Sequence, residues 1–385
     1  MKIIFWFSLL SVSYIYIGYP LYTFVRVKIA KKCVHKNFNY TPFVSVIISA
    51  YNEGRHIENK IQNILGSFYP VEKLEILVGS DGSQDDTNAA LSRISDERVH
   101  TFIYKQRKGK ASVLNRLMAH AKGEIVVFCD ARQTFDKSAI RNLVANFSDE
   151  RVGCVSGELV FMNGDGNTAI SEGVGAYWKY EKFIRKNEAG AHSMVGATGA
   201  IYAIRRTLYS PIPVNTVLDD VYIPLAIARK NYRCVWDETA IAYDKPAISP
   251  YIEYKRKVRT LAGNYQIFGM FKDLFNPFKN AIAIPFFSHK LLRVMSPFFL
   301  ISLFISNLFM ERNGFYGAIL ILQILFYMLA VIGGVNNGTP RGRNKLLMLI
   351  AGPIYSFGLM NYTALVGCYR FLSGKQNIAW EKEDV

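Results

Sequence analysis

Four long stretches of the 385-residue chain contain no charged residue, and they constrain its fold more than any other feature. They cover residues 3–25, 294–310, 314–340 and 346–369. About 20 apolar residues are needed for a helix to cross the hydrocarbon core of a bilayer. Three stretches reach that length, and the second does so when Leu291, Leu292 and a snorkelling Arg293 are added. The sequence therefore predicts an integral membrane protein, with a transmembrane helix at residues 1–25 and three membrane segments within residues 291–372.

Basic residues beside the first stretch indicate its orientation. Residues 26–42 form a basic linker, and Lys and Arg are enriched on the cytoplasmic side of membrane helices. We therefore expect a helix of the plasma (inner) membrane that leaves the amino terminus outside and the central region in the cytoplasm. A cleaved signal peptide is the alternative, but the apolar part is too long and no small-x-small cleavage site precedes the linker.

The carboxyl-terminal part leaves two topologies open. The loop with Arg341, Arg343 and Lys345 is basic and is expected in the cytoplasm, so a further crossing places the tail, residues 373–385, outside. Alternatively, Gly352-Pro353 breaks the last stretch into a re-entrant or interfacial piece, which returns Trp380 to the cytoplasm. Residues 271–290 mix Phe, Pro and Lys, and we expect them to form an interfacial amphipathic segment.

The net charge of +16 favours anionic partners. Much of the positive charge flanks the apolar stretches, where anionic lipid headgroups are a simpler partner than nucleic acid. We therefore expect membrane lipids and no nucleic acid. Four helices from one chain would enclose only a narrow pore, so export of a polymer through it would require partner chains of an export complex.

Strands and helices alternate through the central region, residues 43–270. Apolar runs rich in β-branched residues predict strands at residues 43–50, 74–79, 99–104 and 125–129. This alternation predicts an α/β fold with a Rossmann-like, mostly parallel sheet and helices on both faces. Ligands of such sheets bind beyond the carboxyl ends of the strands, where three of these strands run into polar loops. Ser83 and Asp86 also predict a capping box that begins the helix after the second strand.

Six short motifs follow one another along this region. They are Ser-Ala-Tyr-Asn-Glu at 49–53, Gly-Ser-Asp-Gly-Ser at 79–83, Lys-Gly-Lys-Ala at 108–111 followed by Asn115, Asp-Ala-Arg at 130–132, Gly-Ala-Thr-Gly-Ala at 196–200 with Leu-Asp-Asp at 218–220, and Arg-Lys-Val-Arg-Thr at 256–260. In this order they resemble the motifs of membrane-embedded family 2 glycosyltransferases of GT-A fold, related to cellulose, hyaluronan and poly-N-acetylglucosamine synthases. With the flanking helices, the resemblance covers nearly the whole chain.

The resemblance implies a donor side that binds a UDP-sugar. Tyr51 and Glu53 would contact uracil and ribose, Asp81 would accept a hydrogen bond from the uracil ring, and Lys110 would approach the donor. The position of Lys110 gives a separate physical reason, because a lysine at a helix amino terminus opposes the helix dipole unless an anion offsets it. The alternatives are a plain strand-to-helix turn at Tyr51 and a solvated basic turn at Lys110.

The resemblance also implies a divalent metal, and here the chain departs from the family. The strand at 125–129 ends at Asp130, but the usual Asp-x-Asp is Asp130-Ala131-Arg132. Mg²⁺ or Mn²⁺ prefers oxygen ligands and needs few protein carboxylates when substrate phosphates supply the rest, so Asp130 alone could suffice as metal ligand. Arg132, always protonated, would take over part of the charge neutralisation. Capping of the next segment is the alternative role for Asp130.

On the acceptor side, Thr198 and Gly199 match the loop that lines the family's acceptor channel. Asp220 matches the catalytic base, and Asp219 is left as the candidate for capping the following helix. Arg259 matches the arginine that holds the leaving diphosphate. Arg256 replaces a glutamine and Thr260 replaces the tryptophan that stacks on the acceptor sugar, so that Trp178 or Trp236 is left to substitute for it.

The resemblance thus implies an enzyme of hexosyltransferase type. It would transfer a sugar with inversion from a nucleotide sugar to a glycan hydroxyl, in the synthesis of an exopolysaccharide or surface glycan. Two alternatives remain open. One is a transferase with a lipid-phosphate acceptor, which the basic residues near Lys279 and Lys290 accommodate. The other is a catalytically idle, nucleotide-sugar-binding partner of a synthase complex, which the altered Asp-x-Asp favours.

Overall fold

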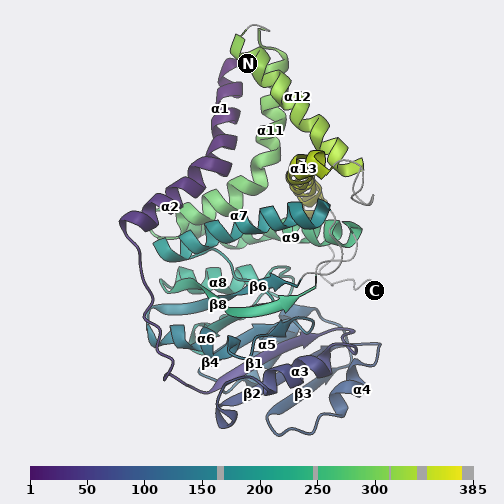
Figure 1. The fold of residues 1–385 in the computed structure, drawn as a ribbon. Helices are drawn as coiled ribbons and strands as arrows, with labels where there is room; N and C mark the ends of the chain where they lie inside the picture. The colour runs from purple at the N-terminus through teal and green to yellow at the C-terminus, as the bar shows by residue number, and fades with distance from the viewer. Residues whose placement is uncertain (163–168, 246–249, 312–313, 336–344, 375–385) are drawn as a thin grey trace.

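The computed structural model describes residues 1–162, 169–245, 250–311, 314–335 and 345–374, in which a sheet domain lies below a group of apolar helices (Figure 1). The amino terminus lies at the end of the helices that is farthest from the sheet. The basic loop with Arg341 and Arg343 and the tail with Trp380 fall outside the described residues.

The sheet has eight strands in the order β3-β2-β1-β4-β7-β6-β8-β5. They are β1 (Val44–Ala50), β2 (Leu74–Asp81), β3 (Val99–Tyr104), β4 (Ile125–Cys129), β5 (Thr134–Phe135), β6 (Val152–Phe161), β7 (Ile201–Arg205) and β8 (Arg233–Asp244). The first four strands are parallel to one another, as the sequence predicts. The second half is mixed, because β7 runs antiparallel to both β4 and β6 and β5 runs antiparallel to β8.

The direction of β7 follows from where its chain enters the sheet. Ile201, its first residue, pairs with Cys129, the last residue of β4. The loop before β7 therefore lies at the carboxyl end of β4, and the strand can only run back along its neighbour. β6 and β8 are parallel, so most neighbouring pairs are parallel and the prediction of a mostly parallel sheet in an α/β architecture is confirmed. The antiparallel pairs all lie in the second half of the sheet.

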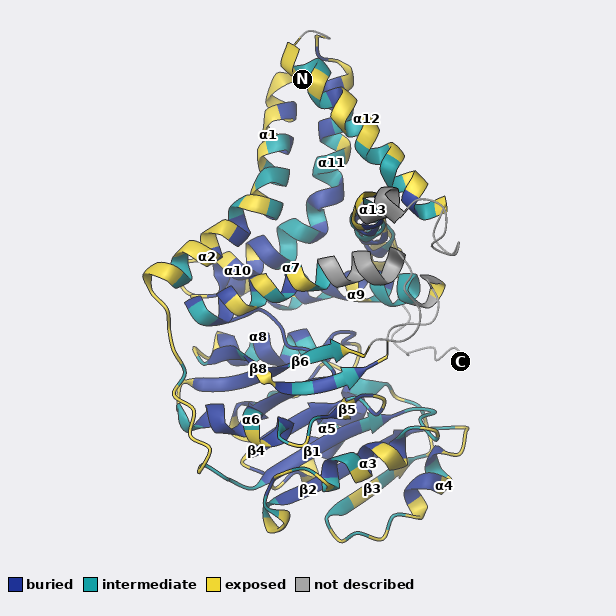
Figure 2. Cartoon of the chain, in the orientation of Figure 1, coloured by how far each residue is buried: buried dark blue, intermediate teal, exposed yellow. Residues whose placement is uncertain are grey.

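Helices cover both faces of the sheet because successive strand residues point to opposite sides. On one side, Ile47 and Phe128 belong to the core that includes residues of α5 (Lys110–His120) and α8 (Asp219–Arg229). On the other side, Val46 and Val127 pack with residues of α3 (Ile57–Leu65), α4 (Thr87–Ser92) and α6 (Ala139–Ala145). The strands β1, β2 and β4 are buried nearly throughout, whereas the edge strand β3 is partly exposed (Figure 2).

The start of α4 differs from the expected capping box. Asp86 is the residue before the helix, but its side chain makes no capping hydrogen bond. Asp85 takes this role instead, because its Oδ1 accepts the backbone N–H of Thr87 at 3.0 Å. Ser83 Oγ accepts the N–H of Asn52 from the neighbouring loop at 3.1 Å. The capping box is therefore wrong, and Ser83 joins two loops of the sheet edge.

Three helices are long and apolar enough to cross a membrane within the described ranges. These candidate spans are Lys2–Ile29, Ala283–Leu308 and Gly314–Val335. They comprise α1 (Lys2–Ser13), η1 (Tyr14–Gly18), α2 (Tyr19–Ile29), α10 (Ala283–Pro285), η6 (Phe286–Leu292), α11 (Arg293–Leu308) and α12 (Gly314–Val335). Many of their side chains are exposed, as expected for surfaces that face lipid (Figure 2).

The helix α13 (Lys345–Leu372) runs across the other apolar helices. It continues through Gly352-Pro353, packs against α7 (Ala169–Ala191), α9 (Pro250–Met270) and α12, and is seen nearly along its axis in Figure 1. Both α7 and α9 lie between the sheet and the candidate spans. The helix is thus unbroken at Gly352-Pro353, and the choice between a further crossing and a re-entrant or interfacial piece stays a prediction.

Residues 271–290 do not form one amphipathic helix. The structure has η5 (Lys272–Phe275), then turns around Pro277, then the first part of the second candidate span from Ala283 onward. A proline lacks the N–H that a continuous helix needs at this point. The expected interfacial segment is therefore short and irregular.

Candidate active site

The ammonium group of Lys110 contacts two acids that are distant in sequence, one after a strand and one at the start of a helix. Gly109 precedes α5 with a φ of 86°, a conformation that favours glycine, and Lys110 is the first residue of the helix. Lys110 Nζ donates a hydrogen bond to Asp130 Oδ1 at 3.0 Å, beyond β4, and lies 3.2 Å from Asp219 Oδ2, at the start of α8. Burial lowers the pKa of Lys110, but Asp130 and Asp219 raise it, and the net pKa is above its usual value.

Asp81 fixes the turn that presents Lys110. Its Oδ1 accepts the backbone N–H of Lys108 at 2.7 Å, and its Oδ2 accepts that of Gly109 at 2.8 Å. The carboxylate is buried at 3% exposure. These bonds give Asp81 a structural role, and the proposed contact with a uracil ring would use its remaining lone pairs.

Asp220 lies beside Asp219 in the first turn of α8, in surroundings that raise its pKa. Burial and the neighbouring Asp219 raise its pKa to about 6, although Lys110, Lys290 and Arg185 lower it. Its carboxylate makes no hydrogen bond to any residue that the structure describes. A Cβ on Gly199 would lie 3.0 Å from Asp220 Oδ2, so the absence of a side chain at 199 keeps this oxygen uncrowded.

Asp219 does not cap α8. The residue before the helix is Leu218, no side-chain capping bond is made, and the Asp219 carboxylate turns to Lys110 instead. The predicted cap is therefore wrong, because an ion pair with a half-buried lysine competes successfully with a capping hydrogen bond.

Two arginines approach from α9. Burial lowers the pKa of Arg259, which lies near Asp219, Asp220 and Asp130. Burial and Arg132 lower the pKa of Arg256, and Asp244 raises it. Arg259 belongs to a group of charged residues that we call the Lys110 cluster. Its members are Lys110, Asp130, Asp219, Asp220 and Arg259.

Arg132, which stands where a second metal-binding aspartate is usual, is already neutralised. Its Nε and Nη2 donate to Oδ1 and Oδ2 of Asp244 at 3.0 and 2.6 Å, and Asp244 is buried at the end of β8. The expectation that Arg132 takes over charge neutralisation of a ligand is therefore not supported by its contacts.

The metal-ligating capacity of the site rests on Asp130. Within the part of the chain that the structure describes, no group of three His, Cys, Asp or Glu side chains could hold a metal ion. Asp130 Oδ1 accepts the Lys110 bond, whereas Oδ2 makes no hydrogen bond to a described residue. One carboxylate oxygen fits a divalent ion whose other ligands are phosphates and water.

Lys60 is a buried cation behind Asp130 that the sequence analysis missed. Its Nζ donates to the Gln133 carbonyl at 2.8 Å and lies 3.5 Å from the centre of the Phe135 ring. Burial lowers its pKa, and Cys129 and Asp130 raise it. The signal was present in the helical pattern, because Lys60 shares the buried face of α3 with Ile57 and Ile64.

The loop after β1 carries Tyr51 and Glu53. One face of the Tyr51 ring is covered by the Arg107 guanidinium, at 3.6 Å from the ring centre. Glu53 is held through its backbone, because its N–H donates to Thr87 Oγ1 at 2.7 Å and its carbonyl accepts the N–H of Ile57. A base that stacks on Tyr51 would have to use the other face of the ring or displace Arg107.

Other motif residues have structural partners. Asn115 Oδ1 accepts from Tyr209 and from the Ile212 backbone, so it fixes the loop before α8. Arg205 donates to backbone carbonyls near α6, and it pairs with Ile125 at the end of β4 opposite Asp130. Thr198 is close to the acceptor-side acids, with its N–H donating to Ser156 Oγ at 2.9 Å.

The two candidate tryptophans also differ in their surroundings. Trp236 packs against the core on the α5 side of the sheet. Trp178 on α7 donates its Nε1 proton to the Leu159 carbonyl at 3.3 Å, and the Arg185 guanidinium lies 5.6 Å from its ring centre. Trp178 is linked to the acceptor-side loop through Arg185, and Trp236 lies opposite Ser156, which binds the same loop.

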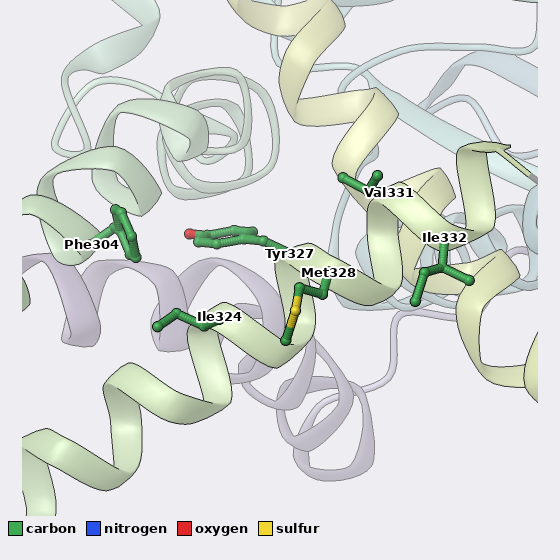
Figure 3. Close-up of a pocket in the computed structure, with 6 residues that line it drawn as sticks. All are labelled: Phe304, Ile324, Tyr327, Met328, Val331 and Ile332. Carbon is green, nitrogen blue, oxygen red and sulfur yellow. The ribbon is translucent and has the colours of Figure 1, made fainter.

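A separate cavity of about 480 Å³ lies between α11 and α12 (Figure 3). Its lining is Phe304, Ile324, Tyr327, Met328, Val331 and Ile332. This surface is apolar apart from one hydroxyl group, and it contains no titratable acid or cation that could act on a sugar nucleotide. The chemistry of the chain therefore belongs to the Lys110 cluster and not to this cavity.

The chain is similar in sequence to known glycosyltransferases. Residues 45–211 match the family described as Glycosyl transferase family 2. The probable glycosyltransferase YdaM of Bacillus subtilis is 24% identical over 253 residues, which cover 60% of this chain and 57% of that protein. The poly-β-1,6-N-acetyl-D-glucosamine synthase of Staphylococcus aureus is 22% identical over 241 residues, which cover 61% and 57%. The match thus spans somewhat more than half the length of these relatives.

Among solved structures, a mannosyltransferase from Pyrobaculum calidifontis, PcManGT in complex with GDP-Man and Mn²⁺, has a similar fold. The TM-score is 0.73 at 22% identity, and the alignment covers 96% of this chain and 99% of the other. The prediction of a GT-A fold is thereby confirmed, and the similarity extends through the three candidate spans.

Proposed function

We propose that this protein transfers a sugar from a UDP-sugar to a glycan hydroxyl, with inversion at the anomeric carbon. The match of residues 45–211 to family 2 glycosyltransferases and the GT-A fold support this proposal. The acceptor would belong to an exopolysaccharide or surface glycan, as the likeness to the poly-β-1,6-N-acetyl-D-glucosamine synthase suggests. The domain would face the cytoplasm from the plasma membrane, because the basic linker at residues 26–42 follows the first candidate span.

The observation that carries the proposal is that a carboxyl with a raised pKa lies beside a lysine that is paired with two other acids. Lys110 ties Asp130 to Asp219, while Asp220 next to them has a pKa raised to about 6 by burial and by Asp219. A general base works best when its pKa lies near the working pH. Permanent cations next to it suit a leaving group that gains negative charge.

In the proposed reaction, Asp220 takes the proton of the acceptor hydroxyl. The acceptor oxygen forms a bond to the anomeric carbon while the bond from that carbon to the diphosphate oxygen breaks, and the electron pair leaves with UDP. Lys110 and Arg259 offset the charge of the departing diphosphate, and Thr198 and Gly199 line the acceptor side. Arg256 would orient the diphosphate or the acceptor from the next turn of α9.

A divalent metal, Mg²⁺ or Mn²⁺, would be held by Asp130 together with the diphosphate, and it would supply further charge stabilisation to the leaving group. The P. calidifontis mannosyltransferase is in complex with Mn²⁺, which favours such an ion here. Tyr51, Glu53 and Asp81 would form the base and ribose end of the donor site. That neighbour binds GDP-Man, so a guanine nucleotide is the main rival donor.

The test is a donor screen on the full-length protein in phosphatidylcholine nanodiscs. Release of UDP or GDP would be measured with UDP-N-acetylglucosamine, UDP-glucose and GDP-mannose, on the wild type, on Asp220→Asn and on Glu97→Gln. Glu97 is an exposed carboxylate before β3 and serves as the control. We expect release from a UDP-sugar, lost by about 10²–10⁴-fold in Asp220→Asn and retained in Glu97→Gln.

Two outcomes would contradict the proposal. Turnover of GDP-mannose alone would overturn the UDP assignment. Tight UDP binding without turnover of any donor, in wild type and both variants, would favour the catalytically idle binding partner.

A further inference from the structure

A buried group of charges, here called the junction cluster, joins α7 to the second candidate span. It consists of Glu181, Arg185, Glu188, His289 and Arg293. Glu181 Oε2 accepts from Arg293 Nη1 at 2.9 Å, and Glu181 Oε1 accepts from Arg185 Nε at 2.9 Å. His289 lies between the two carboxylates, 2.9 Å from Glu188 Oε1 and 3.2 Å from Glu181 Oε1. In this cluster carboxylates and cations neutralise one another.

Lys290, the residue after His289, is different. It makes no hydrogen bond or ion pair with any residue in the described ranges, although it is half-buried in the same π-helical turn, η6. Its Nζ lies 3.4 Å from the position that a Cβ would take on Gly196. The N–H of the next residue, Ala197, donates to the Asp220 carbonyl at 2.7 Å. The ammonium group therefore lies against the acceptor-side loop.

Arg185 reaches the same loop from α7. Its Nε binds Glu181, while its Nη1 lies 3.4 Å from Thr198 Oγ1 and retains hydrogen-bonding capacity. Both Lys290 and Arg185 are close enough to Asp220 to lower the pKa of that carboxyl. Two cations thus stand beside the proposed base, and one of them has no carboxylate of its own. The carboxylates of Glu181, Glu188 and Asp220 act on Lys290 from a distance, but none forms an ion pair with it. A charge that is partly removed from water and lacks a direct partner is stabilised when a further anion approaches it.

We propose that Lys290 and Arg185 bind an anionic group of the acceptor, a phosphate or a carboxylate, and so hold the acceptor next to Asp220. This inference rests on the proposed function, because it names the substrate class of the same site. Lysine would act as a compact point charge and arginine as a directed pair of donors. A phosphate would come from a lipid-linked sugar phosphate, and a carboxylate from a uronic acid residue. A neutral glycan would leave Lys290 without a partner.

The experiment measures acceptor-side binding without any donor. The full-length protein in phosphatidylcholine nanodiscs would be titrated with dodecyl phosphate, dodecyl glucuronide and dodecyl maltoside, which share a chain and differ in the charge of the headgroup. The variants are Lys290→Gln, Lys290→Arg and the control Lys122→Gln. Lys122 is an exposed lysine before β4, at the opposite end of that strand from Asp130, so its loss removes the same net charge away from the site. UDP affinity is measured on the same samples.

We expect at least one anionic probe to bind about 10-fold or more tightly than the maltoside, in line with one hydrogen bond to a charged group. Lys290→Gln should abolish that preference, whereas Lys290→Arg and Lys122→Gln should keep it. A preference for phosphate identifies a lipid-linked acceptor, and a preference for glucuronide identifies an acidic glycan. Equal binding of all three probes, or equal losses in Lys290→Gln and Lys122→Gln, overturns the inference. Failure of the proposed function would appear separately, as absent UDP binding or release.

Discussion

Burial acts in the same direction on the carboxylates of the Lys110 cluster and of the junction cluster, yet the two clusters differ in their titration. At Glu181, burial raises the pKa, but His289, Arg293 and Arg185 reverse the effect and hold the pKa well below its usual value. At Asp220, burial also raises the pKa, and the adjacent Asp219 adds to it, so that the pKa reaches about 6. The composition of the neighbours therefore decides the outcome.

This difference separates a structural from a reactive group of charges. Glu181 stays ionised at any physiological pH. It joins α7 to a candidate span through His289 and Arg293 and also pairs with Arg185 on its own helix. Asp220 changes its charge near pH 6, as a residue that accepts a proton during a reaction must. The predictions below test whether the two clusters can be separated experimentally.

The largest expected effect is on stability, from Glu181→Gln. Removal of this carboxylate leaves His289, Arg293 and Arg185 without their shared partner, and breaking a buried ion pair in this way costs about 3–5 kcal/mol. The free energy of unfolding would be measured by denaturant titration in detergent. The matched control is Glu238→Gln, whose exposed partner Lys186 also lies on α7, and for which about 0–1 kcal/mol is expected.

An equal loss of stability in Glu181→Gln and Glu238→Gln would show that the junction cluster is not a structural clamp. Loss of activity in Glu181→Gln at unchanged stability would instead place it within the reactive site.

A smaller effect is expected in the pH dependence of the rate. Asp220 acts as a base only when it is deprotonated, so kcat/KM should fall about 10-fold for each pH unit below the pKa of about 6 and level off above it. The measurement is nucleotide release between pH 4.5 and 8.5. In Asp219→Asn the like charge is gone, so the inflection should move to lower pH, whereas in Glu97→Gln it should stay.

A pH profile that is flat from 5 to 8 in the wild type would contradict the assignment of Asp220 as the base. An inflection that moves to higher pH in Asp219→Asn would contradict the account of its cause.

Local patterns in the sequence were sufficient for the first half of the sheet and for much of the site. The strand at 125–129 is an apolar run that stops at an acid. The order of the motifs assigned Lys110, Asp130, Asp219 and Asp220 to one site, and the structure brings these residues together. Such inferences succeed because strand ends and helix starts are set by nearby residues.

Partners that are distant in sequence were not predictable in the same way. The Arg132–Asp244 pair spans 112 positions, and nothing near Arg132 indicates it. Hydropathy records the length of an apolar stretch but not its direction, so the sequence did not indicate that α13 runs unbroken across the other apolar helices. The contact of Lys290 with Gly196 depends on how a candidate span meets the sheet domain, which no local pattern encodes.

The smallest expected effect comes from Tyr19→Phe, at the edge of the junction cluster. The Tyr19 hydroxyl donates to Glu188 Oε1 at 2.5 Å, and the same oxygen is 2.9 Å from His289 Nδ1, so its charge keeps one partner after the substitution. Loss of one hydrogen bond of this kind lowers the free energy of unfolding by about 1 kcal/mol, well below the effect of Glu181→Gln. The control is Tyr22→Phe on the same helix, whose hydroxyl accepts an exposed bond from Arg26. If Tyr19→Phe destabilised as strongly as Glu181→Gln, hydrogen bonding rather than charge pairing would hold the junction, and the contrast with the Lys110 cluster would lose its basis.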